Sequence, residues 1–215
     1  WRWLALPRHK DAMQASRTRR VQSCMPGPVS VTHWQGSPLP FIENSGNLMI
    51  IDDMTDIDLG ACERALCRRG RVCFRKDDAW QHIEKPLPGN TDEWTHVLYD
   101  AAGGSVSQDL AVGPPQHLQW SAGPKWTRYQ EAVSGFQTMV SAAGRVFYLL
   151  AQGPRVSLFL PPDWQLIARD AYNGKLLWKR PFTRWVSPLF RYKSGPTQLT
   201  RRLVAIGDRL FMAAN

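Results

Sequence analysis

The stretch Trp164–Lys179, WQLIARDAYNGKLLWK, decides the fold of this chain. Two short runs rich in Leu, Ile and aromatic residues flank a cluster of turn-forming residues, Asp170–Gly174. Asn173 and Gly174 supply the positive φ that a tight reversal needs, and the flanking runs have the composition of strands. The stretch therefore predicts a β-hairpin with strands over 164–169 and 175–179. An isolated hairpin would leave Trp178 in water, so we expect a neighbouring sheet to cover it.

Four residues of this hairpin follow a spaced pattern, A-x-D-x-x-x-G-x-x-x-W, at Ala168, Asp170, Gly174 and Trp178. The pattern resembles the signature of pyrroloquinoline-quinone-type (PQQ-like) β-propeller repeats, although Asn173 stands where that family more often has Thr. In the family the signature covers the last two strands of a four-stranded blade, and its Trp packs against the adjacent blade. The resemblance implies that these four residues build a blade.

The sequence also repeats internally. Residues 139–148 align with 203–212 at a shift of 64, and each stretch reads as strand, turn and strand. A degenerate repeat ends at Trp120, 58 residues before Trp178. One unit then contains strands over 139–142, 145–151, 164–169 and 175–179, the strand count of a propeller blade. We therefore expect an incomplete ring of PQQ-like blades over 96–215, with Trp120 as a further structural residue and the remaining blades needed to close the ring.

The segment 28–76 has a different pattern, which predicts strands over 29–34, 47–53 and 71–74. The second of these runs is continuously apolar, as is typical of a strand buried on both faces of a parallel sheet. Asp58 can cap a helix that follows, and Gly70 would end it. The apolar stripe of that helix contains Leu59, Cys62 and Leu66. The alternation of strands and helix predicts a small α/β region.

This region resembles part of a class I S-adenosylmethionine-dependent methyltransferase, a truncated Rossmann-like fold, on three stretches: Leu39–Phe41, Asn44–Asp53 and Arg64–Gly70. Asp52 and Asp53 end the buried strand, where doubly wound folds place functional groups, so they are the candidate cofactor-binding residues. The glycine-rich turn that a methyl donor needs is missing, because residues 1–26 contain no glycine. We therefore expect no cofactor in this chain, and S-adenosylmethionine or PQQ only in a full-length parent protein.

The positive charge gathers at the beginning of the chain. The net charge is +9, and residues 1–20 hold six Lys and Arg side chains. We expect 1–27 to be a poorly defined basic segment, with at most a helix over 10–20. A nucleic-acid surface would need basic residues interleaved with stacking aromatics, and the stretch 125–129 that has them is interpreted as blade surface. The sequence has no apolar run of about 20 residues, so no transmembrane segment is predicted.

Residues 77–95 are predicted to be a linker between the two regions, because Pro86–Asn90 strongly breaks regular structure. The adjoining motif Asp92-Glu93-Trp94-Thr95-His96 has acidic and imidazole groups that a metal could use. Adjacent side chains on a strand point to opposite faces, so we expect the motif to pin the linker to the first blade and to bind no metal. The cysteines are too scattered for a disulfide framework or a zinc site.

Three functions stay open on the sequence. The first is a non-catalytic scaffold that binds a partner or selects a substrate within a larger protein. The second is part of an S-adenosylmethionine-dependent methyltransferase fused to a propeller. The third is a fragment of a quinone-dependent dehydrogenase, which the resemblance implies would need a closed ring and a bound calcium ion. No catalytic residue is predicted, because the motifs of common hydrolases and of phosphate-binding loops are missing. Neither the partner nor the compartment is predicted.

Overall fold

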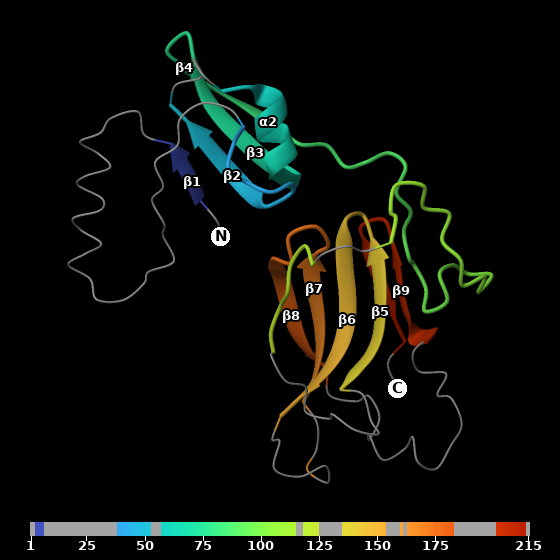
Figure 1. Cartoon of the computed structure of the whole chain (residues 1–215). Helices are drawn as coiled ribbons and strands as arrows, with labels where there is room; N and C mark the ends of the chain where they lie inside the picture. Colours follow the sequence, from blue (N-terminus) through green and yellow to red (C-terminus); the bar gives the residue numbers. More distant parts are fainter. Residues whose placement is uncertain are drawn as a thin grey trace. The chain divides into compact units, whose positions relative to one another are not determined.

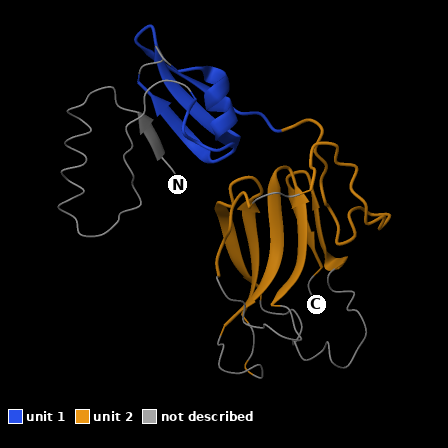
Figure 2. Ribbon diagram, in the orientation of Figure 1, with its two compact units in different colours: residues 1–87 blue, residues 88–215 orange. Residues whose placement is uncertain are grey.

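A computed structural model describes residues 3–6, 38–52, 57–114, 118–124, 135–153, 160, 163–182 and 201–213. This part of the chain is mainly β, as predicted, with ten strands and one short helix. The chain divides into two compact units, residues 1–87 and 88–215 (Figure 2). The strand predicted over 29–34, the helix predicted over 10–20 and the basic aromatic stretch 125–129 all lie outside the described residues. No described helix is long and apolar enough to cross a membrane.

The first unit contains a four-stranded mixed sheet in the order β1-β2-β3-β4 (Figure 1). β1 (Trp3–Leu6), β2 (Gly46–Ile51) and β3 (Leu66–Lys76) run parallel, and β4 (Ala79–Glu84) is antiparallel to β3. β1 is a strand in the segment where none was predicted. The linker prediction is wrong for residues 77–84, because Asp77 and Asp78 both adopt positive φ and form the two-residue turn that joins β3 to β4.

The helix α2 (Leu59–Ala65) begins where the sequence predicts. The Asp58 carboxylate accepts the backbone N–H of Ala61 at 3.0 Å, which confirms the N-cap. The predicted end at Gly70 is wrong, because β3 starts at Leu66 and Gly70 lies inside the strand. A Cβ at Gly70 would lie 2.7 Å from the carbonyl oxygen of Cys67 and 3.0 Å from that of Gly46. This glycine is therefore required for the close approach of two backbones, not for a helix end.

The core of the first unit lies on one face of its sheet. Met49 and Ile51 of β2 are fully buried there with Cys62 of α2, whereas Ile50 on the other face is 36% exposed. The prediction that this strand is buried on both faces is therefore wrong. When successive parallel strands are added in one direction across a sheet, right-handed crossovers place their connecting segments on the same face of that sheet. Among the described residues, both α2 and the segment containing Leu39 pack on that one face.

The second unit contains the predicted four-stranded antiparallel sheet (Figure 1). Its strands follow each other in space in chain order: β5 (Phe136–Ala142), β6 (Arg145–Gln152), β7 (Asp163–Asp170) and β8 (Leu176–Phe182). The hairpin predicted at Trp164–Lys179 is confirmed as β7–β8. A shorter hairpin follows, formed by β9 (Leu203–Ile206) and β10 (Arg209–Met212).

The short hairpin packs on one face of the four-stranded sheet. Leu203 and Ala205 of β9 are fully buried in a shared apolar core. Every strand of the larger sheet contributes to this core; the contributing residues include Val140, Ala142, Phe147, Leu149, Trp164, Leu166, Ala168 and the partly buried Trp178. Because neither β-structure can bury this face alone, the two stabilise each other.

Candidate functional site: the segment that joins two sheets

The turn between β7 and β8 is held by Asp170. Its Oδ1 accepts the backbone N–H groups of Tyr172 at 2.9 Å and of Asn173 at 3.1 Å. Its backbone carbonyl accepts the N–H of Gly174 at 3.0 Å. Gly174 has φ +70°, the left-handed region that favours glycine. Asp170 and Gly174 therefore have the turn-building roles that the sequence predicts.

Ala168 allows two aromatic rings to meet above it. In the paired register, Ala168 of β7 lies between Phe147 of β6 and Trp178 of β8. The centroids of the two rings are 6.0 Å apart, and Ala168 itself is 0% exposed. A larger side chain would stand between the rings. Trp178 thus packs within its own sheet and on the shared core, with the Arg180 guanidinium 5.3 Å from its ring centroid.

Trp120 docks on the turn of the β7–β8 hairpin. Its indole Nε1 donates a hydrogen bond to the carbonyl oxygen of Ala171 at 2.9 Å, across 51 residues of chain. Its ring covers Gly174 so closely that a Cβ there would lie 2.5 Å from Trp120 Cδ2. Position 174 therefore favours glycine for two reasons, its positive φ and the close contact with the Trp120 ring. The residue that ends the degenerate repeat therefore packs on the turn of the β7–β8 hairpin.

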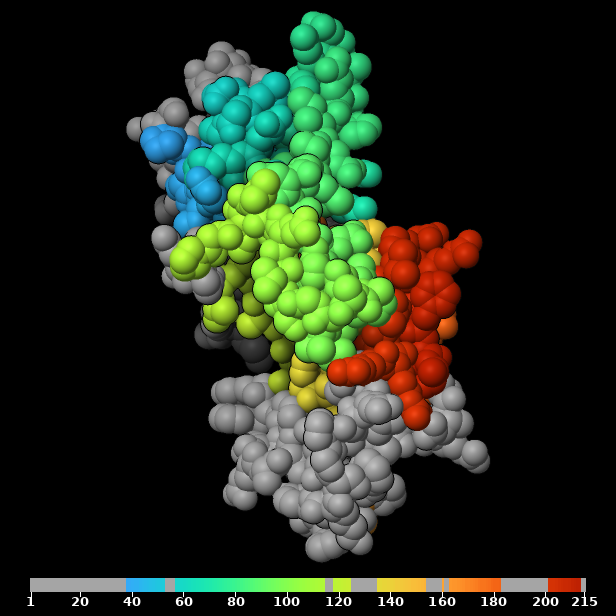
Figure 3. Space-filling model, turned by 90° about the vertical axis from the view of Figure 1, so that its right-hand side faces the viewer, coloured from blue at the N-terminus to red at the C-terminus, as the bar shows by residue number. Residues whose placement is uncertain are grey.

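The segment Asp92–His96, which we call the strap, connects the edge of the four-stranded sheet of the second unit to the edge of the two-stranded β9–β10 sheet. The carbonyl oxygen of Trp94 accepts the backbone N–H of Ser141 in β5 at 2.7 Å. The next carbonyl, that of Thr95, accepts the N–H of Ala205 in β9 at 3.0 Å. Figure 3 shows residues of this part of the chain, in green, against the red β9–β10 hairpin. Ser141 and Ala205 occupy the same position in the 64-residue repeat, so the strap binds equivalent points of two successive sheets.

Each side chain at the beginning of the strap has a structural partner. Glu93 Oε1 accepts the N–H of Ala143 in the β5–β6 turn at 2.6 Å. Asp92 Oδ2 accepts the Tyr99 hydroxyl at 2.5 Å and the N–H of Gln108 at 2.8 Å. These hydrogen bonds, the one from Tyr99 above all, hold the pKa of Asp92 below its usual value, and the same contact raises the pKa of Tyr99. Asp92 therefore stays ionised and fixes the loop that follows the strap.

The rest of the strap packs locally. The rings of Trp94 and Tyr99 meet edge to face with centroids 5.5 Å apart. Thr95 Oγ1 lies 2.8 Å from Nδ1 of His96, which also forms a backbone bridge with Tyr99. The sequence prediction that this motif pins the linker to the first sheet agrees with the hydrogen bonds that Trp94 and Glu93 accept from β5 and the β5–β6 turn. Its second attachment, to β9, was missed because hydrogen bonds through backbone carbonyls leave no residue-type signal.

Of the two candidate cofactor residues of the first unit, only Asp52 is described. Asp52 is exposed at the carboxyl end of β2, and Asp53 lies outside the described residues. Within the described ranges, no group of three or more His, Cys, Asp or Glu side chains could hold a metal ion.

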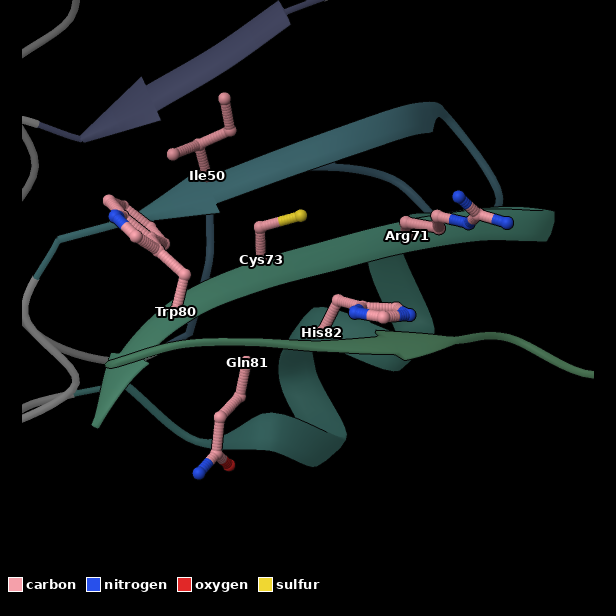
Figure 4. Close-up of a pocket in the computed structure, with 6 residues that line it drawn as sticks. All are labelled: Ile50, Arg71, Cys73, Trp80, Gln81 and His82. Carbon is pink, nitrogen blue, oxygen red and sulfur yellow. The ribbon is translucent and has the colours of Figure 1, made fainter. Parts of the chain in front are cut away.

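The open face of the first unit's sheet carries a shallow pocket of about 390 Å³ that sequence reasoning missed (Figure 4). The register places Cys73 between Ile50 and His82, and Trp80 beside them is 57% exposed. Arg71 also lines the pocket and pairs with Glu84 at 2.8 Å, whereas the side chain of Gln81 points to the opposite side of the sheet. A thiol next to an imidazole has the groups of a nucleophile–base pair. Among the described residues no hydrogen bond or ion pair orients that imidazole, so what the geometry shows here is an exposed surface.

Comparison with protein-family models, with curated proteins and with solved structures gives no match for this chain. The resemblances to PQQ-like repeats and to methyltransferases therefore stay predictions that rest on the residues themselves.

Proposed function

We propose that the second unit is a non-catalytic repeat segment of a PQQ-like β-propeller, which serves as an interaction or substrate-selecting scaffold within a larger protein. The observation that carries the proposal is the strap, whose adjacent carbonyls at Trp94 and Thr95 bind equivalent residues of two successive sheets. The signature residues support it as well. Ala168, Asp170, Gly174 and Trp120 all contribute to building or joining β-structure.

The proposal requires the two sheets to be thermodynamically coupled, and Leu203 tests the coupling. Leu203 belongs to β9, but its fully buried side chain lies in the core of both sheets. Leu203→Ala should cost about 2–5 kcal/mol and should lower hydrogen-exchange protection in β6 and β7 as well as in β9. Phe211→Ala is the control on the same hairpin, because its side chain is 51% exposed and does not belong to the shared core. Loss of protection confined to β9 and β10 would refute a jointly built scaffold.

Ligand binding separates the scaffold from enzymatic alternatives. We expect no saturable heat of binding when S-adenosylmethionine, or PQQ with Ca²⁺, is titrated into the protein. A ligand present at 100 times its Kd would stabilise the fold by about 2.7 kcal/mol, which a thermal melt would detect. Saturable binding of either ligand would overturn the non-catalytic proposal.

A second candidate is that the first unit belongs to an S-adenosylmethionine-dependent methyltransferase. The parallel β2–α2–β3 crossover with Asp52 at the carboxyl end of β2 favours it. If this candidate is right, S-adenosylmethionine binds and Asp52→Asn weakens the binding, whereas Asp58→Asn, at the helix cap, leaves the affinity unchanged. Equal effects of the two substitutions would count against a cofactor role for Asp52.

A further inference from the structure

The turn between β7 and β8 contains the only Asn–Gly dipeptide of the sequence, Asn173-Gly174. Asparagine followed by glycine is the pair most prone to deamidation, because glycine has no Cβ to shield its backbone nitrogen from the preceding side chain. Asn173 Oδ1 accepts the backbone N–H of Lys175 at 2.9 Å, a hydrogen bond that a carboxylate oxygen would also accept. The turn therefore carries a reactive amide that this contact does not require.

Deamidation of this pair begins at the backbone nitrogen of Gly174. The nitrogen loses its proton to a base in the solvent and attacks Cγ of Asn173, so that an N–Cγ bond forms, the Cγ–Nδ2 bond breaks and ammonia leaves. Water then opens the resulting five-membered succinimide ring at one of its two carbonyls. One opening gives aspartate, and the other gives isoaspartate, whose main chain runs through the side chain and is one carbon longer. Either product gains a negative charge.

In the folded turn both reacting groups are held in other contacts. The Gly174 N–H donates to the carbonyl oxygen of Asp170 at 3.0 Å, so the proton that must leave is bonded to an acceptor that cannot remove it. The carboxamide of Asn173 is held by the Lys175 N–H. The Asp170 carboxylate, which accepts the N–H groups of Tyr172 and Asn173, also disfavours a second anion beside it. The reaction therefore needs the turn to open.

Trp120 keeps this turn closed. Its Nε1 donates to the carbonyl oxygen of Ala171 at 2.9 Å, and its ring lies so close to Gly174 that a Cβ there would be 2.5 Å from it. Arg169 Nη1 also donates to the carbonyl oxygen of Gly174 at 2.8 Å. Opening of the turn breaks these contacts. A reaction that proceeds only from an open form follows the equilibrium population of that form.

From these contacts we propose that Asn173 is a self-modification site that the docked Trp120 holds unreactive, so that deamidation irreversibly marks chains whose turn has opened. The inference goes beyond the scaffold function and does not depend on it. Isoaspartate at position 173 lengthens the main chain just before Gly174 and moves that glycine from its place under the Trp120 ring. Aspartate at the same position keeps an acceptor for the Lys175 N–H and lets the turn close.

Ageing of the whole chain at mildly alkaline pH, followed by digestion and mass spectrometry, tests the proposal. Deamidation is measured as the mass increase at position 173, and isoaspartate is identified by electron-transfer fragmentation. We expect the wild type to react at least about tenfold more slowly than a synthetic peptide of residues 168–180, because an isolated hairpin is mostly open.

Variants of Trp120 measure its part in the protection. Trp120→Ala should accelerate deamidation at least about fivefold, and Trp120→Phe, which removes the indole donor and keeps an aromatic ring, should accelerate it less. Trp80→Ala is the matched control, because Trp80 is 57% exposed in the first unit, and it should leave the rate within about twofold. If Trp120→Ala does not fold, Trp120→Phe takes its place in the comparison.

Three results would overturn the proposal. Equal rates in the wild type and the peptide would show that the turn gives no protection, and an unchanged rate in the Trp120 variants would show that Trp120 does not keep it closed. A product with aspartate but no isoaspartate would mean direct hydrolysis of the amide. Hydrogen exchange separates local from global opening: in Trp120→Ala it should accelerate at Gly174 and stay unchanged at Leu149 in β6. Equal acceleration at both amides would assign the reaction to unfolding of the whole sheet and refute the local mechanism.

Discussion

Phe147 and Trp178 lie on strands separated by β7, and yet their ring centroids are only 6.0 Å apart. Two strand spacings amount to about 9.6 Å. The rings meet because the fully buried residue between them, Ala168, has a side chain of a single carbon. The small residue in the repeat signature is thus a packing requirement, and the aromatic pair covers it.

Ala168→Leu should destabilise the second unit by about 1–3 kcal/mol, because the added carbons must displace one of the two rings. Urea denaturation followed by far-UV circular dichroism measures the change. Ala102→Leu, on an exposed turn, is the control and should leave the midpoint within error. An equal midpoint for wild type and Ala168→Leu would show that the rings do not need the space.

Gly174→Ala should destabilise the protein more than Gly207→Ala. Both glycines have positive φ, so each substitution strains the backbone by about 1–2 kcal/mol. Only at Gly174 does the new Cβ meet the Trp120 ring, since nothing lies within 4 Å at Gly207. In a Trp120→Ala background the two glycine substitutions should cost the same. A difference that persists without the Trp120 ring would contradict the docking contact.

The strap should open on acidification. The pKa of Asp92 is lower in the folded protein than its usual value of 3.8. Its stabilising effect is therefore complete above that value and is lost as the pH falls through the lower folded pKa. Hydrogen exchange at Gln108, whose N–H the carboxylate accepts, should accelerate in that range. Asp92→Asn should remove most of the pH dependence; an unchanged acid response in this variant would assign it to another group.

The strap should also open at high pH. The hydrogen bond to Asp92 raises the pKa of Tyr99 above 10.0. Between 10.0 and the raised pKa, the folded state holds a proton that the unfolded state has lost, so stability falls as the pH rises. Tyr99→Phe should lack this alkaline loss of protection at the strap. If the variant and the wild type respond alike above pH 10, Tyr99 is not the group responsible.

The three described cysteines should differ in reactivity. Burial, with the nearby carboxylates of Asp58 and Glu63, raises the pKa of the Cys62 thiol to about 11, and Cys67 is 1% exposed. Cys73 is only partly buried, on the open face of the first sheet. A short pulse of iodoacetamide at neutral pH should label Cys73 before Cys62 and Cys67, as read by mass spectrometry. Labelling at equal rates would mean that the core around α2 opens freely.

The sequence by itself determined the elements whose signals are local. The turn at Asp170–Gly174 and the alternating runs around it identify the hairpin, and the cap at Asp58 identifies the start of the helix. These preferences are local because they come from the φ/ψ and hydrogen-bonding chemistry of neighbouring residues. The shift of 64 also placed the β9–β10 hairpin correctly. The open face around Ile50 was not predicted, because the direction of the crossovers decides which face of a sheet is covered.

Only the tertiary structure decided how the sheets are joined. The motif at 92–96 is visible in the sequence, but its bonds to Ser141 and Ala205 run through main-chain carbonyls that every residue possesses. The contact of Trp120 with Gly174 likewise connects residues 54 positions apart, by their numbers. Local sequence fixes the shape of each hairpin. Which hairpins pack together depends on long-range packing and on main-chain groups that are the same in nearly every residue.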